Sequence, residues 1–157
     1  MPTVEPQVVA ASARALPRYG PDFRYGQSLV VGGPLVAAGI ASGATTLLAL
    51  AQVPPARAAL RRLRPPGSGP GAEQRERGWF RLRVVGEGGG RRVVTEVRGG
   101  DPGYGATSQM LAEAALCLAG DDLPETAGQV TTAVAMGPAL RSRLDEVGIT
   151  SRVVEEG

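Results

Sequence analysis

The feature that most constrains this sequence is a stretch from Tyr25 to Ala56 that contains no charged side chain. A Gly-Gly-Pro run at 32–34 interrupts the stretch early and leaves a predicted helical core at about 35–51, close to the roughly 20 apolar residues that span a bilayer. Three interpretations stay open for residues 28–53: a buried core helix or packing partner, a membrane anchor, and an apolar lining for a lipidic substrate.

Charge and composition exclude several classes of function. All 17 basic residues are arginines, they alternate with 15 acidic residues, and histidine is absent. Because the net charge is only +2 and no single-sign face is predicted, nucleic-acid binding is disfavoured. Cys117 has no histidine to activate it, so we expect a small buried side chain there. The first residues form no secretory signal, so we expect a cytoplasmic protein, peripheral to a membrane if the apolar segment is an anchor.

Proline and glycine divide the chain into three predicted regions, 1–64, 65–76 and 77–157. The first region contains a helix at 5–16, the apolar segment, and a short basic amphipathic helix at 55–64. The arginines of that second helix would rest on anionic lipid headgroups or simply face solvent. The second region begins with PPGSGPGA and is predicted to be a flexible linker or long loop.

The third region predicts a hairpin followed by helices and a last strand. Apolar residues alternate with polar ones at 79–85 and 92–98, and the glycine-rich 86–90 is the predicted turn. A helix follows at 106–118, then a helix ending at Gly148 and a strand at 149–154. The predicted apolar stripe of the 106–118 helix comprises Met110, Leu111, Ala114, Ala115 and Leu118. We therefore predict an α+β fold, in which helices and an apolar segment precede an antiparallel or mixed sheet with packed helices.

Two tyrosine-containing loops present polar side chains outside regular elements. The first, at 18–26, concentrates aromatic and charged residues in an aromatic-poor chain, namely Tyr19, Asp22, Arg24 and Tyr25 among others. The second, at 99–105, has the sequence GGDPGYG and places Asp101 and Tyr104 before the 106–118 helix. Each loop is a candidate ligand site, with internal hydrogen bonding or packing of the same side chains as the alternative.

Several motifs together are similar to the carboxy-terminal part of saccharopine dehydrogenase-like oxidoreductases, and more narrowly to trans-acting enoyl reductases of actinobacteria. The resemblance rests on the 18–26 loop and on RGWF at 77–80, GGDPGYGAT at 99–107 and MLAEAALCL at 110–118. It also includes the last segment of the motif set, from AMG at 135–137 to Gly148-Ile149. It covers nearly the whole chain. In that family a Rossmann domain with a Gly-rich fingerprint comes first, and no such segment is recognised in these residues.

The resemblance implies an NADP-linked reduction of a carbon–carbon double bond in a polyketide-derived lipid, carried out by an enzyme of which this chain is the substrate-side part. The alternatives are a membrane-associated interaction module derived from such an enzyme and an inactive truncated product. We expect this chain alone to bind no cofactor, and the expected partners are a Rossmann-domain half, a polyketide synthase and a membrane surface. A reduction of this kind needs a proton donor, and with no lysine or histidine the candidates are tyrosines and carboxylates. Tyr104 is the predicted catalytic acid, and the predicted substrate-binding residues are Asp101, Tyr19, Asp22, Arg24 and Tyr25.

Overall fold

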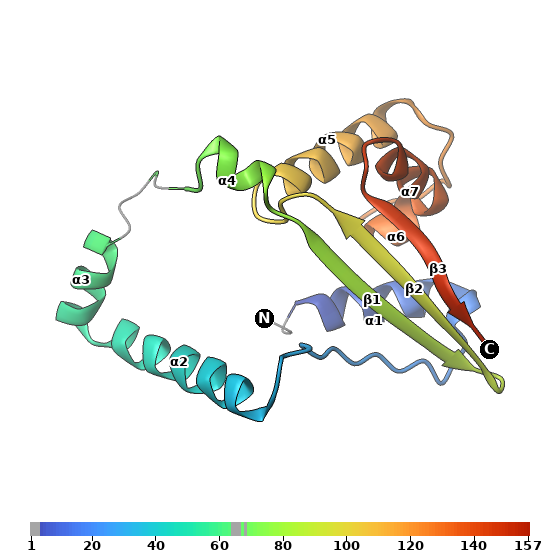
Figure 1. The fold of residues 1–157 in the computed structure, drawn as a ribbon. Helices are drawn as coiled ribbons and strands as arrows, with labels where there is room; N and C mark the ends of the chain where they lie inside the picture. Colours follow the sequence, from blue (N-terminus) through green and yellow to red (C-terminus); the bar gives the residue numbers. More distant parts are fainter. Residues whose placement is uncertain (1–3, 64–66, 68) are drawn as a thin grey trace. The chain divides into compact units, whose positions relative to one another are not determined.

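A computed structural model describes residues 4–63, 67 and 69–157 of the chain (Figure 1). It divides into two compact units, one made of residues 1–25 with 71–157 and the other of residues 26–70. Seven helices, a short 3₁₀ helix and one three-stranded antiparallel sheet confirm the predicted α+β class among the described residues. The first helix therefore belongs to the same unit as the sheet, whereas the sequence predicted it in one region with the apolar segment.

The sheet of the larger unit consists of β1 (Phe80–Gly88), β2 (Arg91–Gly99) and β3 (Thr150–Glu156), with β2 in the middle. Both neighbouring pairs are antiparallel. The strands confirm the predicted hairpin and last strand. At one end of the sheet the β1–β2 turn connects these two strands, and at the other end β2 leads into α5 (Figure 1).

The hairpin turn is tighter than predicted. We expected a turn over 86–90, but Gly86 and Gly88 remain in the strand ladder opposite Val93 and Arg91. Only Gly89 and Gly90 form the turn, with φ of 59° and 77°. A two-residue turn with positive φ at both positions matches the twist of antiparallel strands, and glycine adopts it without a Cβ penalty. The glycine run therefore lengthens the hairpin.

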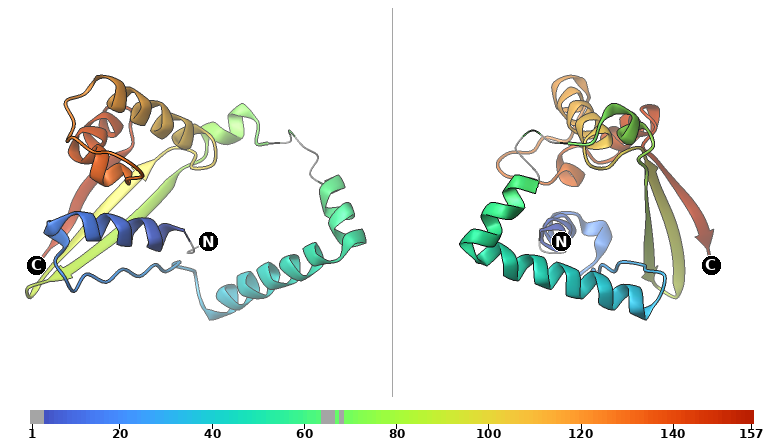
Figure 2. Two further views of the ribbon diagram at one scale, coloured as in Figure 1. Left: turned by 180° about the vertical axis from the view of Figure 1, so that it is seen from behind. Right: turned by 60° about the vertical axis from the view of Figure 1, so that its left-hand side comes forward.

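The helices of this unit lie where the sequence predicted most of them. They are α1 (Glu5–Ala15), η1 (Pro17–Tyr19), α4 (Ala72–Glu76), α5 (Gly105–Gly120), α6 (Thr132–Ala135) and α7 (Gly137–Glu146). The last residues of the predicted 65–76 linker thus form α4. Its end is supported by an ion pair between Arg77 and Glu73, 2.6 Å apart. Residues 65, 66 and 68 of the predicted linker lie outside the described residues. In Figures 1 and 2, α1, α5 and α6 lie on the same side of the sheet.

The core lies between α5, α6 and α7 and is built from small side chains. Cys117 is completely buried, as predicted, and packs with Ala135 and Met136. The predicted apolar stripe of α5 is wrong in part, because Leu111 and Leu118 are 72% and 60% exposed and Ala115 is exposed as well. Small inward residues let α5 approach α7 closely, so the larger leucines are left on the outer face.

The smaller unit contains α2 (Pro34–Gln52) and α3 (Pro54–Leu63), which confirm the helices predicted within 28–53 and 55–64; Arg64 lies outside the described residues. α2 is the one described helix that is long and apolar enough to cross a membrane, with a mean hydropathy of 1.7. None of its residues is buried. The hydroxyls of Ser42 and Thr45 donate to the carbonyls of Gly39 and Ala41 within the helix, which removes their need for an outside partner.

Candidate functional site

The turn between β2 and α5 is organised by the carboxylate of Asp101. It accepts backbone N–H groups from Gly103 at 3.3 Å, Tyr104 at 2.8 Å and Gly105 at 2.9 Å. The carbonyl of Asp101 also accepts the amide of Ala106 at 2.8 Å. The first two amides of α5, those of Gly105 and Ala106, have no partner within the helix and are therefore satisfied by one residue.

Electrostatics reinforce this turn. Hydrogen bonds from the amides of Gly105 and Tyr104 lower the pKa of Asp101, because they stabilise the ionised carboxylate. Gly78 lies against the same residue, since a Cβ added there would come within 2.9 Å of the Asp101 Cβ. The chain entering β1 thus packs directly on the turn, and the amides of Gly103, Tyr104 and Gly105 already bind the Asp101 carboxylate.

Tyr104 stands at the start of α5 with its side chain 53% exposed. Its backbone amide binds Asp101 and its carbonyl accepts the amide of Ser108. Its main chain is therefore fixed by the turn while its ring remains accessible to a ligand from solvent. The predicted role of Tyr104 as a proton donor stays a prediction.

The 18–26 loop places its predicted residues differently. Tyr19 packs edge-on against Phe23, with 4.8 Å between ring centroids, and the guanidinium of Arg18 lies 5.6 Å from the Tyr19 ring. Tyr19 is thus held by neighbours within the loop. Asp22, Arg24 and Tyr25 are exposed. Their predicted contact with substrate stays a prediction.

The structure does not bring the two loops together. Figures 1 and 2 show the chain after α1 beginning near the β1–β2 turn, whereas α5 begins at the opposite end of the sheet. β1 and β2 each contain nine residues. Strands of this length extend over about 30 Å, so the start of the 18–26 loop lies far from the turn before α5.

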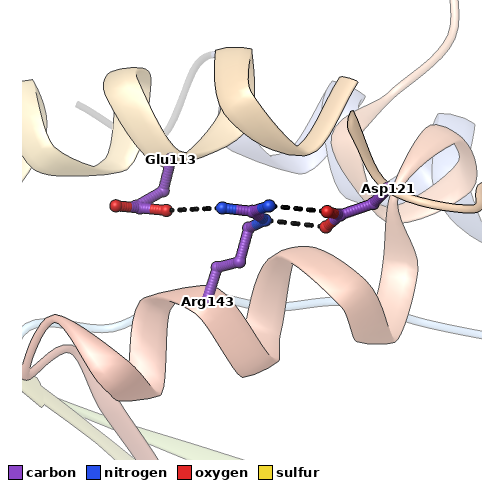
Figure 3. A network of polar contacts seen from close by, with 3 residues as sticks. All are labelled: Glu113, Asp121 and Arg143. Carbon is purple, nitrogen blue, oxygen red and sulfur yellow. Dashed lines mark hydrogen bonds and ion pairs between the residues drawn. The ribbon is translucent and has the colours of Figure 1, made fainter. Parts of the chain in front are cut away.

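A polar network that the sequence did not reveal links α5 to α7 (Figure 3). Arg143 donates two hydrogen bonds to Asp121, at 2.7 and 2.6 Å, and a third to Glu113 at 3.3 Å. The signal in the sequence is the spacing of Glu113, Cys117 and Asp121, which are four residues apart and therefore lie on one face of a helix.

The network changes the acidity of its members. The hydrogen bonds from Arg143 lower the pKa of Asp121 to about 2, and the same contacts raise the pKa of Arg143. Burial, followed by a hydrogen bond to Asp121, raises the pKa of the Cys117 thiol. A neutral, buried thiol is a poor nucleophile, so Cys117 has a packing role. The hydrogen bonds of Arg143 to Asp121 and Glu113 hold α5 and α7 together.

Metal ions and dinucleotides each require a particular set of groups. No group of three or more His, Cys, Asp or Glu side chains among the described residues could hold a metal ion. A pyrophosphate would need a glycine-rich turn that opens a helix with free amides. The run at 86–90 lies between two strands, and Asp101 occupies the amides at the start of α5. Neither segment fits a dinucleotide.

Sequence comparison finds homologues that are named for one activity. A Mycobacterium tuberculosis protein with trans-acting enoyl reductase in its name is 36% identical over 151 residues, a match that covers 84% of this chain and 34% of that protein. The trans-acting enoyl reductase of Mycobacterium ulcerans is 35% identical over 144 residues, covering 83% of this chain and 34% of that protein.

A trans-acting enoyl reductase of Mycobacterium bovis is 32% identical over 145 residues, again covering 83% of this chain and 34% of the relative. No family profile and no solved structure matches the chain. The chain thus spans about a third of the length of the curated relatives that it matches. It is homologous, over most of its own residues, to part of the trans-acting enoyl reductases.

Proposed function

We propose that this chain forms the substrate-side part of a saccharopine dehydrogenase-like enoyl reductase, which reduces a carbon–carbon double bond of a polyketide-derived lipid. The observation that carries the proposal is the identity of 32–36% over 83–84% of the chain to three proteins named as trans-acting enoyl reductases. The α+β unit supplies a rigid platform for such a role, because the turn before α5 is fixed by its hydrogen bonds.

Within this function the hydride is added to one carbon of the double bond, and Tyr104 donates the proton to the other carbon. Its exposed ring on a fixed backbone supports this role, since a general acid must be positioned and reachable at once. Asp101 acts through the turn, because its carboxylate is engaged by three amides. Tyr19, Asp22, Arg24 and Tyr25 contact a more distant part of a long substrate.

NADP supplies the hydride in this proposal, and neither the 86–90 turn nor the start of α5 offers free amides for its pyrophosphate. The nucleotide therefore belongs to a Rossmann domain outside these residues, on the same polypeptide or a partner. We expect calorimetric titration of this chain with NADPH to give no saturable heat. Saturable binding at micromolar NADPH would contradict the assignment of the nucleotide to another domain. The chimera below tests the reductase activity separately.

A chimera tests the proposed activity. The third of the Mycobacterium tuberculosis relative that matches this chain would be replaced by this chain, and NADPH oxidation would be followed with an enoyl thioester. We expect turnover within about tenfold of the parent, because the substrate-side residues are exchanged for homologous ones. A chimera that folds and binds NADPH but does not reduce the thioester contradicts the proposal.

Membrane association is a second candidate function, and the exposure of α2 favours it. Nineteen residues without a charge form a helix in which none is buried. Such a helix is about 28 Å long, close to the thickness of a bilayer core. The arginines of α3, Arg57, Arg61 and Arg62, follow directly and are suited to anionic headgroups. A membrane would bring the enzyme to a lipidic substrate.

A further inference from the structure

We propose that one face of the sheet docks a carboxylate-rich surface of a partner protein. This arginine face comprises Arg81, Arg83, Arg98 and Arg152 around Glu96 on the central strand. The inference comes from the distribution of charge on the sheet and does not rest on the proposed reductase activity. It goes beyond that activity by assigning a second contact surface to the chain.

Strand register brings these side chains together. Glu96 on β2 lies opposite Arg83 on β1 and Arg152 on β3, and Arg81 lies opposite Arg98. Directly opposed residues share one face of a sheet. The carboxylate of Glu96 lies 3.6 Å from Nε of Arg81 and 3.7 Å from Nε of Arg83, and it also pairs with Arg98.

The charges on this face do not balance. The four arginines of the arginine face share a single carboxylate, which leaves a charge of +3: Arg81, Arg83 and Arg98 lie within ion-pair distance of Glu96, and Arg152 lies opposite it in the strand register. Towards the hairpin turn the balance is reversed, because Arg91 and Arg92 pair with three acids, Glu87, Glu155 and Glu156, which leaves −1. A chain with a net charge of only +2 thus concentrates positive charge at one end of its sheet.

The arginines remain available to a partner. Glu96 is only 5% exposed, but the side chains of Arg81, Arg83 and Arg98 are 50%, 64% and 58% exposed. Like charges directly opposite each other destabilise a sheet, and exposed ion pairs contribute little in return. Carboxylates from a partner would relieve this repulsion and pair with guanidinium donors that Glu96 does not use.

An exposed tryptophan borders the same face. Trp79 is the only tryptophan of the chain, it is 69% exposed, and the guanidinium of Arg81 lies 5.9 Å from its ring centroid. Tryptophan and arginine are the residues most enriched in the energetic centres of protein interfaces. A solvent-exposed tryptophan beside unbalanced arginines therefore favours a protein surface as the occupant.

The spacing of the guanidinium groups favours several carboxylates over one phosphate. The arginines are distributed over three strands, which are about 4.8 Å apart from one to the next. Glu96 occupies the centre of the cluster, where a single anion would otherwise bind, and it repels an anion at that point. Carboxylates placed around Glu96 can each meet a separate guanidinium group.

Trp79 provides the readout. The full chain in nonionic detergent would be titrated with poly-L-glutamate while Trp79 emission is followed. We expect a saturable change whose apparent Kd rises at least tenfold in Arg83→Gln/Arg98→Gln. Arg14→Gln/Arg141→Gln removes the same charge elsewhere and should stay within twofold of the wild type. Arg152→Gln, at an exposed position, should weaken binding severalfold and serves if the double variant fails to fold.

Four outcomes would overturn the proposal. They are no saturable response, equal weakening in the Arg14→Gln/Arg141→Gln control, an identical response to inorganic phosphate at equal charge, and self-association lost in Arg83→Gln/Arg98→Gln. The third would indicate a small-anion site, and the fourth, read by light scattering, would assign the face to a second copy of this chain.

Discussion

Helices α2 and α5 are both rich in alanine and leucine, yet they meet their surroundings in opposite ways. α5 buries Ala106 and Cys117 and is tied to α7 through Arg143. α2 buries none of its residues although it contains more consecutive apolar ones. A helix enters the core of this protein through small inward side chains and a partner helix, so an apolar sequence alone does not decide burial.

The largest expected effect is on the partition of the chain into membranes. Ile40→Arg/Leu47→Arg places two charges in α2, at a cost of about 2.5–3.5 kcal/mol each at a helix centre in a bilayer. We expect the wild type to float with vesicles containing anionic lipid and this variant to lose more than about 100-fold in partition.

The matched control places the same charges on the other helix. Leu111→Arg/Leu118→Arg alters exposed leucines of α5 and should leave flotation unchanged. If the wild type remains soluble and monodisperse without detergent and does not float, α2 is not a membrane helix and the second candidate function fails.

A smaller effect is expected where α5 meets α7. Arg143→Gln removes the bidentate partner of Asp121 and leaves two carboxylates facing each other, Asp121 and Glu113. Thermal unfolding should shift down by about 5 °C, the range for losing one partly buried ion pair in a domain of this size. Arg141→Gln, on the exposed side of the same helix, should shift it by less than about 1 °C. Equal shifts would show that the network adds no stability.

The pH dependence sharpens this prediction. Because the pKa of Asp121 is lowered from 3.8 to about 2, the pair stabilises the fold fully above about pH 4 and less as the pH falls through 2. The difference in unfolding temperature between wild type and Arg143→Gln should therefore narrow below pH 4. A constant difference from pH 7 to pH 2 would place the stabilisation elsewhere.

The smallest effect concerns the cap of α5. Asp101→Ala removes the acceptor of three amides and should lower the unfolding temperature by about 3 °C, as loss of a helix cap does. Hydrogen exchange at Tyr104 and Gly105 should accelerate as well. Asp122→Ala, at an exposed loop position, is the control. Unchanged exchange at both amides would contradict the capping role.

Local patterns predicted most of the secondary structure. Period-two alternation located the hairpin, Pro17 and Gly148 located helix ends, and the absence of charge located α2, because each is a property of consecutive residues. The sequence did not predict that Leu111 and Leu118 face outward or that Gly86 and Gly88 remain paired. Those outcomes depend on tertiary contacts with α7 and on strand register.

The candidate site was predicted as a set of residues but not as an arrangement. Tyr104 and Asp101 were identified together on one turn, and the structure joins them through the Tyr104 amide. The 18–26 loop was assigned to the same substrate, yet it begins near the opposite end of the sheet (Figure 2). Arg143 was missed because its partners are 22 and 30 residues away in the sequence.

We propose that Tyr104, on the turn before α5, supplies the proton of an enoyl reduction, and steady-state kinetics of the chimera described above test this proposal most directly. Tyr104→Phe should lower kcat by about 10²-fold, the low end for loss of a general acid, with little change in KM. Tyr25→Phe, in the distant loop, should leave kcat within about twofold. If Tyr104→Phe keeps both kcat and KM within about twofold and only lowers the unfolding temperature, Tyr104 is structural and the claim is wrong.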